Sequence, residues 1–439
     1  MTHPTKAPSP DQPSLVVRPE ELAGIDRSVA SMAVIPGSRM FEIKDALSVF
    51  TRSRPGEETY DASQGDGGAS LPGVPPELFD RANALQKEHG SGYDKPFGTP
   101  GFRKSVVENY WNLEEASGWG PDNIIACQGG RDALLKIYDA VQALGFGRRG
   151  DFILVSRVPW ISYNWGPYSV GSNVMLAPGR EEDAWALTEE SIAESVRYAQ
   201  TIENRKVAAL VITSPDNPTG RTIGEERQAS LARAAFSAGV PYVVFDWIYH
   251  RVTDGPHHDL NRFLSRLEPT ERERCIFLDG LTKSLGASNV RNAHVAASKK
   301  VVKFIQNRAS HGVIPSFYGL AVAMAAYEMG YEKAAASVVG PTNESRKVMA
   351  SFLEDKGIRH ILGKGYYAFL YVGPWMDRSG MADSAAMGAY LAEKFGLAVV
   401  PGVYFSGFAS RWIRFSYALP PGRTRGAASR LWEALEALR

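Results

Sequence analysis

Short apolar runs alternate with helical segments through the middle of this 439-residue chain, and this alternation limits the folds that it can adopt. The apolar runs occupy residues 124–127, 152–155, 207–213, 241–245, 275–278 and 293–297. Apolar residues at helical spacing lie between some of them, at 132–144 and 224–238. Strands that are apolar throughout are typical of parallel sheets with helices on both faces. The pattern therefore predicts an α/β fold with a mainly parallel, doubly wound sheet.

The C-terminal part of the chain has a different character. An apolar helix is expected at 315–329 and a long helix at 342–356, followed by strands at 366–372 and 412–417 and helices at 385–395 and 424–438. We expect a large domain over 61–330 and a smaller α+β domain over 331–439, with an N-terminal arm at 20–60 that belongs to the small domain and holds a helix near 41–50. Residues 1–19 are rich in Pro, Ser and Thr and are predicted to be disordered.

Composition narrows the possible partners. The formal net charge of +1 offers no electrostatic attraction to nucleic acid or to an anionic membrane. No stretch approaches the roughly 18 apolar residues of a membrane span. Cys127 and Cys275 lie in apolar runs and are predicted to be buried thiols of a reducing compartment. We therefore expect a cytoplasmic protein with no nucleic-acid partner, no membrane segment and no metal site.

Lys283 is the candidate catalytic residue. It follows the apolar run 275–278 in the stretch Asp279-Gly-Leu-Thr-Lys-Ser-Leu-Gly286, and Arg291 comes eight positions after it. An amine that is partly neutral attacks carbonyl groups, and pyridoxal phosphate needs such a lysine together with an acid for its ring nitrogen and a phosphate cradle. A solvated loop lysine is the alternative for Lys283 taken alone.

Three further strand ends carry polar groups. Gln128-Gly-Gly-Arg131 turns from a strand directly into a helix, where free backbone N–H groups and the helix dipole attract an anion, although a plain turn fits equally well. Asn217 is held between two prolines in Ser214-Pro-Asp-Asn-Pro-Thr-Gly220. Asp246 ends an apolar strand, where a carboxylate is costly unless a group such as a pyridinium nitrogen pairs with it.

Three other segments have weaker signals. The glycine-rich loop Gln64-Gly-Asp-Gly-Gly68 is expected to be flexible, and Tyr93 lies in the loop Gly92-Tyr-Asp-Lys-Pro-Phe-Gly98. Trp160 follows a strand, where it stacks on a flat cofactor or belongs to the core.

Five motifs in this order resemble those of the class I/II aminotransferases, which are fold type I enzymes dependent on pyridoxal phosphate. They are Ser214–Gly220, Asp246-x-x-Tyr249, Gly280-x-Thr-Lys283, Arg291 and Arg414 in Trp-Ile-Arg-Phe-Ser-Tyr. The resemblance runs from about residue 30 to the C-terminus. It implies a homodimer that acts on amino-acid and keto-acid substrates.

The resemblance also implies a role for each matching residue. Lys283 binds the cofactor as a Schiff base and moves the proton at the substrate α-carbon, while Asp246 pairs with the ring nitrogen. Asn217 and Tyr249 hydrogen-bond the phenolic oxygen of the ring, and Trp160 stacks on it. Arg414 binds the substrate α-carboxylate, with the Gly65 region closing over the substrate. The phosphate is assigned to Gly130, Arg131, Thr282, Arg291 and, from the neighbouring subunit, Tyr93.

The chain departs from the family pattern at several positions. Asp279 stands where the most similar subgroup often has Asn, Trp247 stands where Glu usually follows the aspartate, and His250 follows the tyrosine. Around Arg291 the chain reads Asn-Val-Arg-Asn-Ala instead of Gly-x-Arg-x-Gly. We interpret the protein as a divergent branch, serving specialised metabolism.

These departures leave the reaction open. An aminotransferase acting on an α-amino acid is favoured. A lyase or cyclase resembling the aminocyclopropane-carboxylate synthases, or an oxidative enzyme of the same fold, uses the same lysine. Transcription regulators with an aminotransferase-like domain carry a basic winged-helix segment ahead of it, and residues 1–30 are too short and not basic enough for one. The aromatic residues Trp160, Tyr163, Trp165 and Trp247 and also His250 are expected either to line a substrate pocket or to belong to the core.

Overall fold

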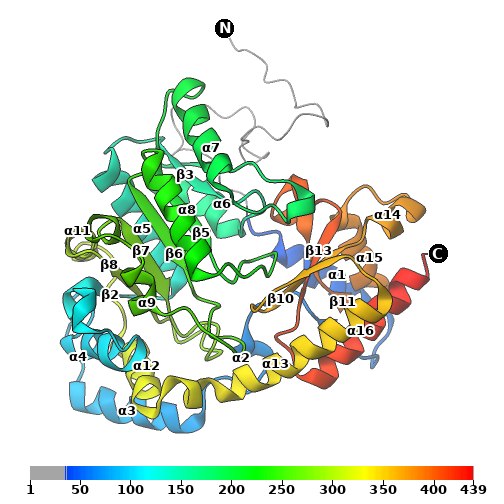
Figure 1. Cartoon of the computed structure of the whole chain (residues 1–439). Helices are drawn as coiled ribbons and strands as arrows, with labels where there is room; N and C mark the ends of the chain where they lie inside the picture. The colour runs from blue at the N-terminus through cyan, green and yellow to red at the C-terminus, as the bar shows by residue number, and fades with distance from the viewer. Residues whose placement is uncertain (1–34, 36, 439) are drawn as a thin grey trace.

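The computed structural model describes residue 35 and residues 37–438. The predicted disorder of residues 1–19, and the arm from 20 to 34, lie outside the described residues. Within the described part, Figure 1 shows a large sheet with its helices on one side of the molecule and a smaller group of strands and helices on the other.

The large sheet has seven strands. In spatial order they are β2 (Ile124–Cys127), β8 (Ala293–Ala297), β7 (Cys275–Asp279), β6 (Tyr242–Asp246), β5 (Val207–Thr213), β3 (Phe152–Val155) and β4 (Asn173–Leu176). Strands β7, β6, β5, β3 and β4 pair in parallel, whereas β8 runs antiparallel to both β7 and β2. Every residue in these strands is buried, as the apolar runs predict for six of them, whereas β4 was not predicted from the sequence. The prediction of a mainly parallel sheet is therefore confirmed.

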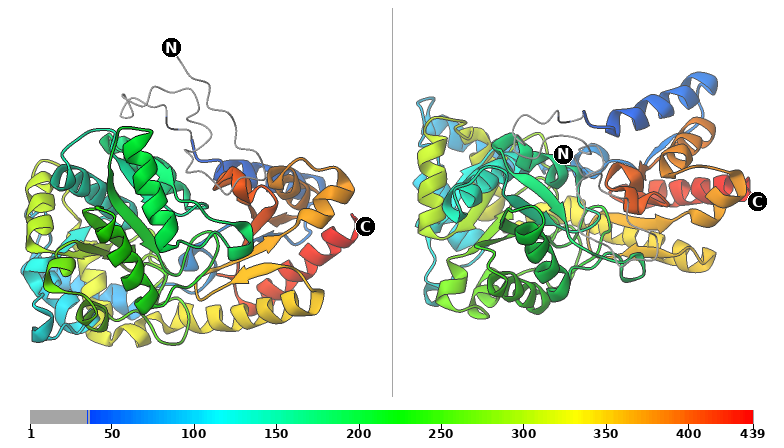
Figure 2. Two further views of the ribbon diagram at one scale, coloured as in Figure 1. Left: turned by 45° about the horizontal axis from the view of Figure 1, so that its top comes forward. Right: turned by 90° about the horizontal axis from the view of Figure 1, so that it is seen from above.

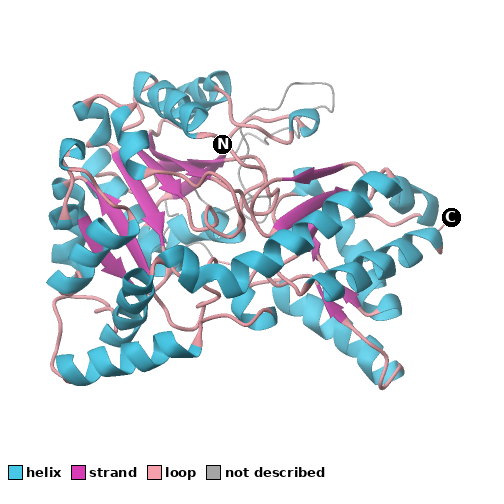
Figure 3. Ribbon diagram, turned by 60° about the horizontal axis from the view of Figure 1, so that its bottom comes forward, coloured by secondary structure: helices cyan, strands magenta, loops and turns pink. Residues whose placement is uncertain are grey.

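Helices cover both faces of this sheet, as Figure 3 shows. Alternate strand residues, such as Phe245 and Val244, enter two separate apolar cores. The helices around the first core are α3 (Pro76–His89), α4 (Pro100–Ser105), α7 (Glu189–Thr201), α8 (Glu225–Ser237), α9 (Leu260–Ser265) and α12 (Phe317–Met329). Those around the second are α5 (Gly130–Gly145), α6 (Ile161–Trp165) and α11 (Lys299–Ala309).

The second group of elements is built on a four-stranded antiparallel sheet. Its strands, in spatial order, are β12 (Val400–Pro401), β13 (Trp412–Ser416), β10 (Tyr367–Tyr371) and β9 (His360–Leu362). A parallel pair, β1 (Tyr60–Asp61) and β11 (Leu397–Ala398), lies beside it. Its helices are α1 (Met40–Ser53), α14 (Gly373–Ser379), α15 (Ser384–Phe395) and α16 (Pro421–Glu436). Because α1 packs on α15 and β1 pairs with β11, the described part of the N-terminal arm lies with these C-terminal elements.

One long helix joins the two groups. Helix α13 (Tyr331–Lys356) contacts α12 at one end and α16 along its C-terminal part, and the left view in Figure 2 shows it running along the lower edge of the molecule. The sequence predicts only its second half, from about Thr342. In the structure Pro341 lies inside the helix, which begins ten residues earlier at Tyr331. Packing of Ala334, Ala335 and Val338 against neighbouring elements outweighs the local cost of the proline.

Two short helices complete the chain, α2 (Gly67–Ser70) and α10 (Pro269–Arg272). Helix α2 lies in the glycine-rich loop that the sequence predicts to be flexible. Its N-terminus is capped by the Asp66 carboxylate, which accepts a hydrogen bond from Gly68 N at 3.0 Å. Asp66 also accepts from the Ser288 hydroxyl at 2.5 Å. The loop is therefore fastened to the segment that follows Lys283.

Candidate active site

The predicted functional residues gather at the carboxyl ends of β5, β6 and β7, where they face β10 and β13 of the small sheet. Parallel sheets present their loops and ligands at this edge. The long-range contacts join β5–β7 to residues more than a hundred positions later, so the site lies between the two halves of the molecule.

Asp246 ends β6 with its side chain almost fully buried. Its carboxylate accepts hydrogen bonds from the Tyr163 hydroxyl at 2.7 Å and from Ile248 N at 3.1 Å. Thr213 in turn donates to the Tyr163 oxygen at 2.9 Å. Burial raises the pKa of Asp246 to about 6, and the hydrogen bond from Tyr163 opposes this rise. A cationic partner would lower that pKa again, so Asp246 is well suited to pair with a protonated ring nitrogen.

Lys283 lies between Gly65 and the Tyr249 ring. Its Nζ donates to the carbonyl oxygen of Gly65 at 2.5 Å and lies 5.4 Å from the centre of the Tyr249 ring. Gly65 has to be a glycine, because a Cβ at this position would lie 1.7 Å from the Tyr367 hydroxyl oxygen. The glycine-rich loop is therefore held against the lysine.

A row of hydrogen-bonded side chains continues from Tyr249 to Arg414. The Asn217 amide donates to the Tyr249 oxygen at 3.3 Å, and its own oxygen accepts from Arg414 at 2.7 Å. Arg414 also donates to the carbonyl oxygen of Ser63 at 2.7 Å and lies over the Tyr367 ring at 4.2 Å. Arg414 is buried, and among the described residues it has no carboxylate partner, which leaves it available to an anionic substrate.

A cradle for an anion lies at the N-terminus of α5. The Arg291 guanidinium donates to Ser288 O at 2.7 Å and Gln128 O at 3.1 Å. A Cβ on Gly129, whose φ is +80°, would lie 2.5 Å from that guanidinium, so only glycine permits this approach. The first backbone N–H groups of α5 open beside it. The hydroxyl oxygen of Thr282 is buried and makes no hydrogen bond to any described residue.

Trp160, at the start of α6, contacts both the cradle and the Asp246 cluster. The Arg131 guanidinium lies 5.5 Å above its ring, and its ring meets Tyr163 edge to face at 5.5 Å. Trp160 is half-buried, so part of its face remains accessible. Arg131 therefore lies beside the cradle, with its guanidinium on the tryptophan.

Tyr93 is the one predicted site residue that the single chain does not bring to the others. It lies in the loop that follows α3, and its side chain is 100% exposed. Its assignment to a neighbouring subunit stays a prediction.

The hydrogen bonds that three residues make to the predicted site residues were not anticipated from the sequence. Tyr163 and Thr213 hold Asp246, and Tyr367 donates to or accepts from Tyr249 at 2.9 Å while lying under Arg414. Tyr163 stands three residues after Trp160, a helical spacing that places both side chains on one side of α6. No sequence signal marks Tyr367, which reaches the site from β10.

The aromatic residues proposed for a substrate pocket divide between two places. Trp160 and Tyr163 border the site, and Trp165 lines a cavity of about 440 Å³ between α5, α6 and the start of α1. Trp247 and His250 belong instead to the buried core on the opposite face of the sheet. Trp247 follows Asp246 directly, and successive strand residues point to opposite faces, so the core alternative holds for it.

Comparison with known proteins agrees with this geometry. The sequence pattern of the family described as aminotransferase class I and II matches residues 63–431, so the chain belongs to this family. It is a pyridoxal-phosphate-dependent transaminase.

Characterised relatives are distant but extend over most of the chain. It is 24% identical over 348 residues to an aspartate aminotransferase of Bacillus subtilis, covering 79% of this chain and 84% of the relative. It is 25% identical to an aspartate/prephenate aminotransferase of Thermus thermophilus, covering 82% and 88%. An aminotransferase structure from Mycobacterium tuberculosis superposes with a TM-score of 0.78 at 18% identity, covering 93% and 98%. The structures share the fold with this chain.

The residues present fit the cofactor of the family. The buried Thr282 hydroxyl and the glycine-lined guanidinium of Arg291 offer donors to a phosphate, and the buried Asp246 offers a negative charge to a pyridinium. Lys283 lies close to the Tyr249 ring, and its charge acts to lower the pKa of Asp246. When bound, pyridoxal phosphate supplies an electron sink that acidifies the substrate α-carbon. No helix in the described part of the chain is long and apolar enough to cross a membrane.

Proposed function

We propose that this enzyme transfers the amino group of an α-amino acid with Lys283 as the residue that carries the cofactor. The observation that supports this most strongly is the continuous row of contacts from Lys283 through Tyr249 and Asn217 to Arg414. It places a lysine amine, a phenol and a buried guanidinium in one space. Asp246 and the Arg291 cradle lie on either side of Lys283 in sequence and border the same space.

Each side chain has one task in this proposal. Asp246, held by Tyr163, keeps the ring nitrogen protonated, and Tyr249 with Asn217 holds the phenolic oxygen. Thr282, Arg291, Arg131 and the Gly130 backbone hold the phosphate, and Trp160 covers the ring. Lys283 would take the proton from the substrate α-carbon, and its delivery to the cofactor instead of back to the substrate would make the reaction a transamination. The Gly65 loop closes the site against water.

Arg414 is assigned to the substrate α-carboxylate, and this can be tested by substitution. We expect Arg414→Ala to lower kcat/KM roughly 100-fold or more through KM, because a buried, doubly hydrogen-bonded ion pair is lost. The cofactor should remain bound and the protein yellow, because Arg414, which donates to Asn217 and Ser63, is not among the residues assigned to the phosphate or to the ring nitrogen. Arg430→Ala is the matched control, because Arg430 bonds to Phe395 O on the small domain. An unchanged KM in Arg414→Ala would contradict the assignment.

The reaction itself is decided by one incubation. Holoenzyme is mixed with single amino acids and no keto acid, and absorbance and products are followed by spectroscopy and mass spectrometry. Transamination leaves the amine form of the cofactor and one equivalent of keto acid. Sustained turnover with the original colour retained would replace this proposal with the lyase or oxidative alternative.

We further propose that the protein is a homodimer in which Tyr93 reaches the phosphate held by its partner. The complete exposure of Tyr93 in the single chain agrees with this, because its hydroxyl is accessible to a second subunit. Tyr93→Phe should weaken cofactor retention by about 0.5–1.5 kcal/mol, or up to about 3 if the hydroxyl meets the charged phosphate. Equilibrium dialysis measures the affinity for the cofactor. Tyr390→Phe is the control, since the Tyr390 hydroxyl donates to Ala434 O far from the site. A monomer with full cofactor occupancy would refute the assembly.

A cytoplasmic location is part of the same proposal. Both cysteines, Cys127 and Cys275, are free and buried, in agreement with the sequence. Burial raises the pKa of the Cys127 thiol to about 12, so it stays protonated and unreactive.

A further inference from the structure

Asp279 ends β7 on the opposite face of the sheet from Asp246. Asp246 is paired in register with Leu278, and Phe277 stacks on Phe245 in the core beside α12. Because strand residues alternate between faces, Asp279 follows Phe277 into that core, whereas Asp246 points toward α5 and α6. The chain thus has two buried carboxylates at adjacent strand ends, one on each face.

Three hydrogen-bond donors converge on Asp279. Its Oδ2 accepts from the Tyr110 hydroxyl at 2.5 Å and contacts His250 Nε2 at 2.8 Å, and its Oδ1 accepts from Gly280 N at 2.7 Å. The carboxylate is almost completely buried. These hydrogen bonds favour the charged form of the carboxylate and so act against the effect of its burial.

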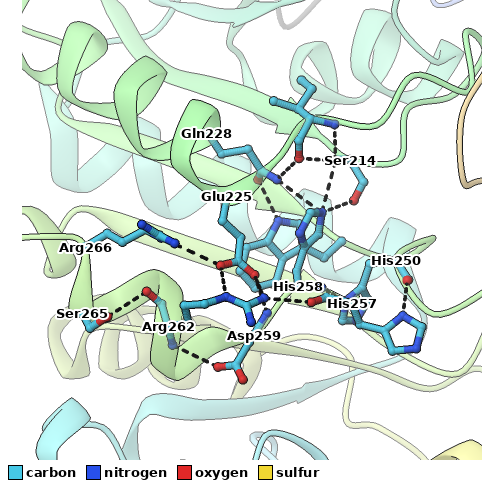
Figure 4. A network of polar contacts seen from close by, with 12 residues as sticks. Ser214, Glu225, Gln228, His250, His257, His258, Asp259, Arg262, Ser265 and Arg266 are labelled. Carbon is cyan, nitrogen blue, oxygen red and sulfur yellow. Dashed lines mark hydrogen bonds and ion pairs between the residues drawn. The ribbon is translucent and has the colours of Figure 1, made fainter. Parts of the chain in front are cut away.

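The tautomer of His250 follows from its other contact. His258 N donates to His250 Nδ1 at 3.1 Å, so Nδ1 is the acceptor and Nε2 carries the proton given to Asp279. Burial holds the pKa of His250 well below its ordinary value, so the ring is neutral. Figure 4 shows His250 beside His257 and His258, whose contacts continue to Gln228 on α8.

Other ionisable groups around Asp279 act on its charge. Burial raises the pKa of Asp279, and the hydrogen bonds and nearby cationic charge oppose that rise. The titratable and charged groups that face it, besides Lys283 and Asp246, are Tyr110, His250, Arg251, His258, His294, Tyr327 and Tyr331. Arg251 lies over the Tyr110 ring at 4.9 Å, and its charge acts to lower the pKa of Asp279.

The bond between His250 and Asp279 joins the two segments that carry the cofactor residues. His250 follows Tyr249 in the turn that begins at Asp246, and Asp279 opens the loop that leads to Lys283. A backbone hydrogen bond from Trp247 N to Leu278 O at 3.0 Å and the contact between Lys283 Nζ and the Tyr249 ring also link these segments. Movement of His250 or Asp279 therefore moves the turn relative to the lysine.

We propose that Asp279 and His250 are a positioning pair for the cofactor, which rests on the proposed function of Lys283 and Asp246. The pair holds the Asp246–Tyr249 turn against the Lys283 loop and keeps a second negative charge behind Asp246. That charge stabilises the protonated, positively charged form of the bound cofactor. The asparagine that the most similar subgroup often has at this position lacks the charge, so Asp279 distinguishes this chain from those relatives.

The test is a pH titration of the visible absorbance of the cofactor in purified holoenzyme, from about pH 5 to about pH 10. Asp279→Asn should lower the midpoint by about half a pH unit or more, the effect of one charge removed at short range inside a protein. His250→Phe should shift the midpoint in the same direction, because losing this donor favours the uncharged form of Asp279. The phenylalanine keeps a ring that can stack on Trp111. His250→Phe decides the matter if Asp279→Asn does not fold.

Asp151→Asn is the matched control, since Asp151 is an equally buried carboxylate that precedes β3 at the amino end of the parallel strands. It should leave the midpoint where it is in the wild type. Midpoints of Asp279→Asn and His250→Phe that equal the wild-type value would overturn the inference while leaving the proposed function intact. A wild-type protein that binds no cofactor on Lys283 would instead remove the proposed function, and the inference with it.

Discussion

Lys283→Ala is expected to abolish turnover, with a loss of at least about 10⁴-fold, because one amine both carries the cofactor and moves the substrate proton. The variant should also lose the covalent link that borohydride reduction makes permanent. Mass spectrometry of proteolytic fragments reads this out directly, since the reduced adduct in the wild type should lie on the fragment that contains Lys283.

Lys136→Ala is the matched control for that experiment. Lys136 lies on α5 near the phosphate cradle, but it is paired with Asp132 at 2.7 Å. It should keep turnover and the adduct on Lys283. Recovery of the adduct on any other lysine of the wild type, or a colourless protein, would remove the central assignment.

Asp246→Asn is expected to have two opposite effects. Activity should fall roughly 10²–10³-fold, the size seen when one preorganised electrostatic group is removed, because the neutral amide no longer keeps the ring nitrogen protonated. The cofactor-free protein should become more stable above pH 6. Burial raises the pKa of Asp246 to about 6, so at neutral pH the folded, cofactor-free protein holds an unfavourable charge.

The direction of the stability effect follows from proton uptake. Between about pH 4 and pH 6 the folded protein binds a proton at Asp246 that the unfolded chain does not, so this group's contribution to stability falls as pH rises through that window. Above pH 6 the shift from 3.8 to about 6 corresponds to about 3 kcal/mol in favour of the asparagine variant. Urea unfolding of both cofactor-free proteins at pH 5 and pH 8 measures it. A difference that does not grow with pH would show that Asp246 is not the buried charge described here.

The activity and stability measurements on Asp246→Asn test the same feature of the site, a buried negative charge that is tolerated because the positive charge of a ligand compensates it. Stability and activity therefore respond in opposite directions at Asp246. They should respond in the same direction at Tyr163, whose hydroxyl donates to Asp246 and to no ligand in the proposal.

The sequence alone determined most of the large sheet and the candidate catalytic and binding residues at its edge. Six of the seven strands are marked by apolar runs such as residues 207–212, and this local signal places their boundaries to within a residue. The edge strand β4 (Asn173–Leu176) was not predicted. Asp246 and Asn217 stand at strand ends, where topology brings them together whatever the rest of the chain does. Lys283 follows the same rule, so the assembly of these residues at one edge was predictable.

Only the tertiary structure decided the contacts between segments far apart in the chain. Tyr367 reaches Tyr249 across 118 positions, and no local pattern in β10 indicates this. The start of α13 at Tyr331 was missed for a related reason, since packing overrides the helix-breaking preference of Pro341. The side of the sheet on which a side chain lies was also decided only by the tertiary structure. Trp247 and His250 read equally as pocket or core, and the alternation of β6 and β7 about the sheet placed them in the core beside Asp279. Long-range contacts depend on which surfaces meet, and that information is distributed over the whole chain instead of residing in any one motif.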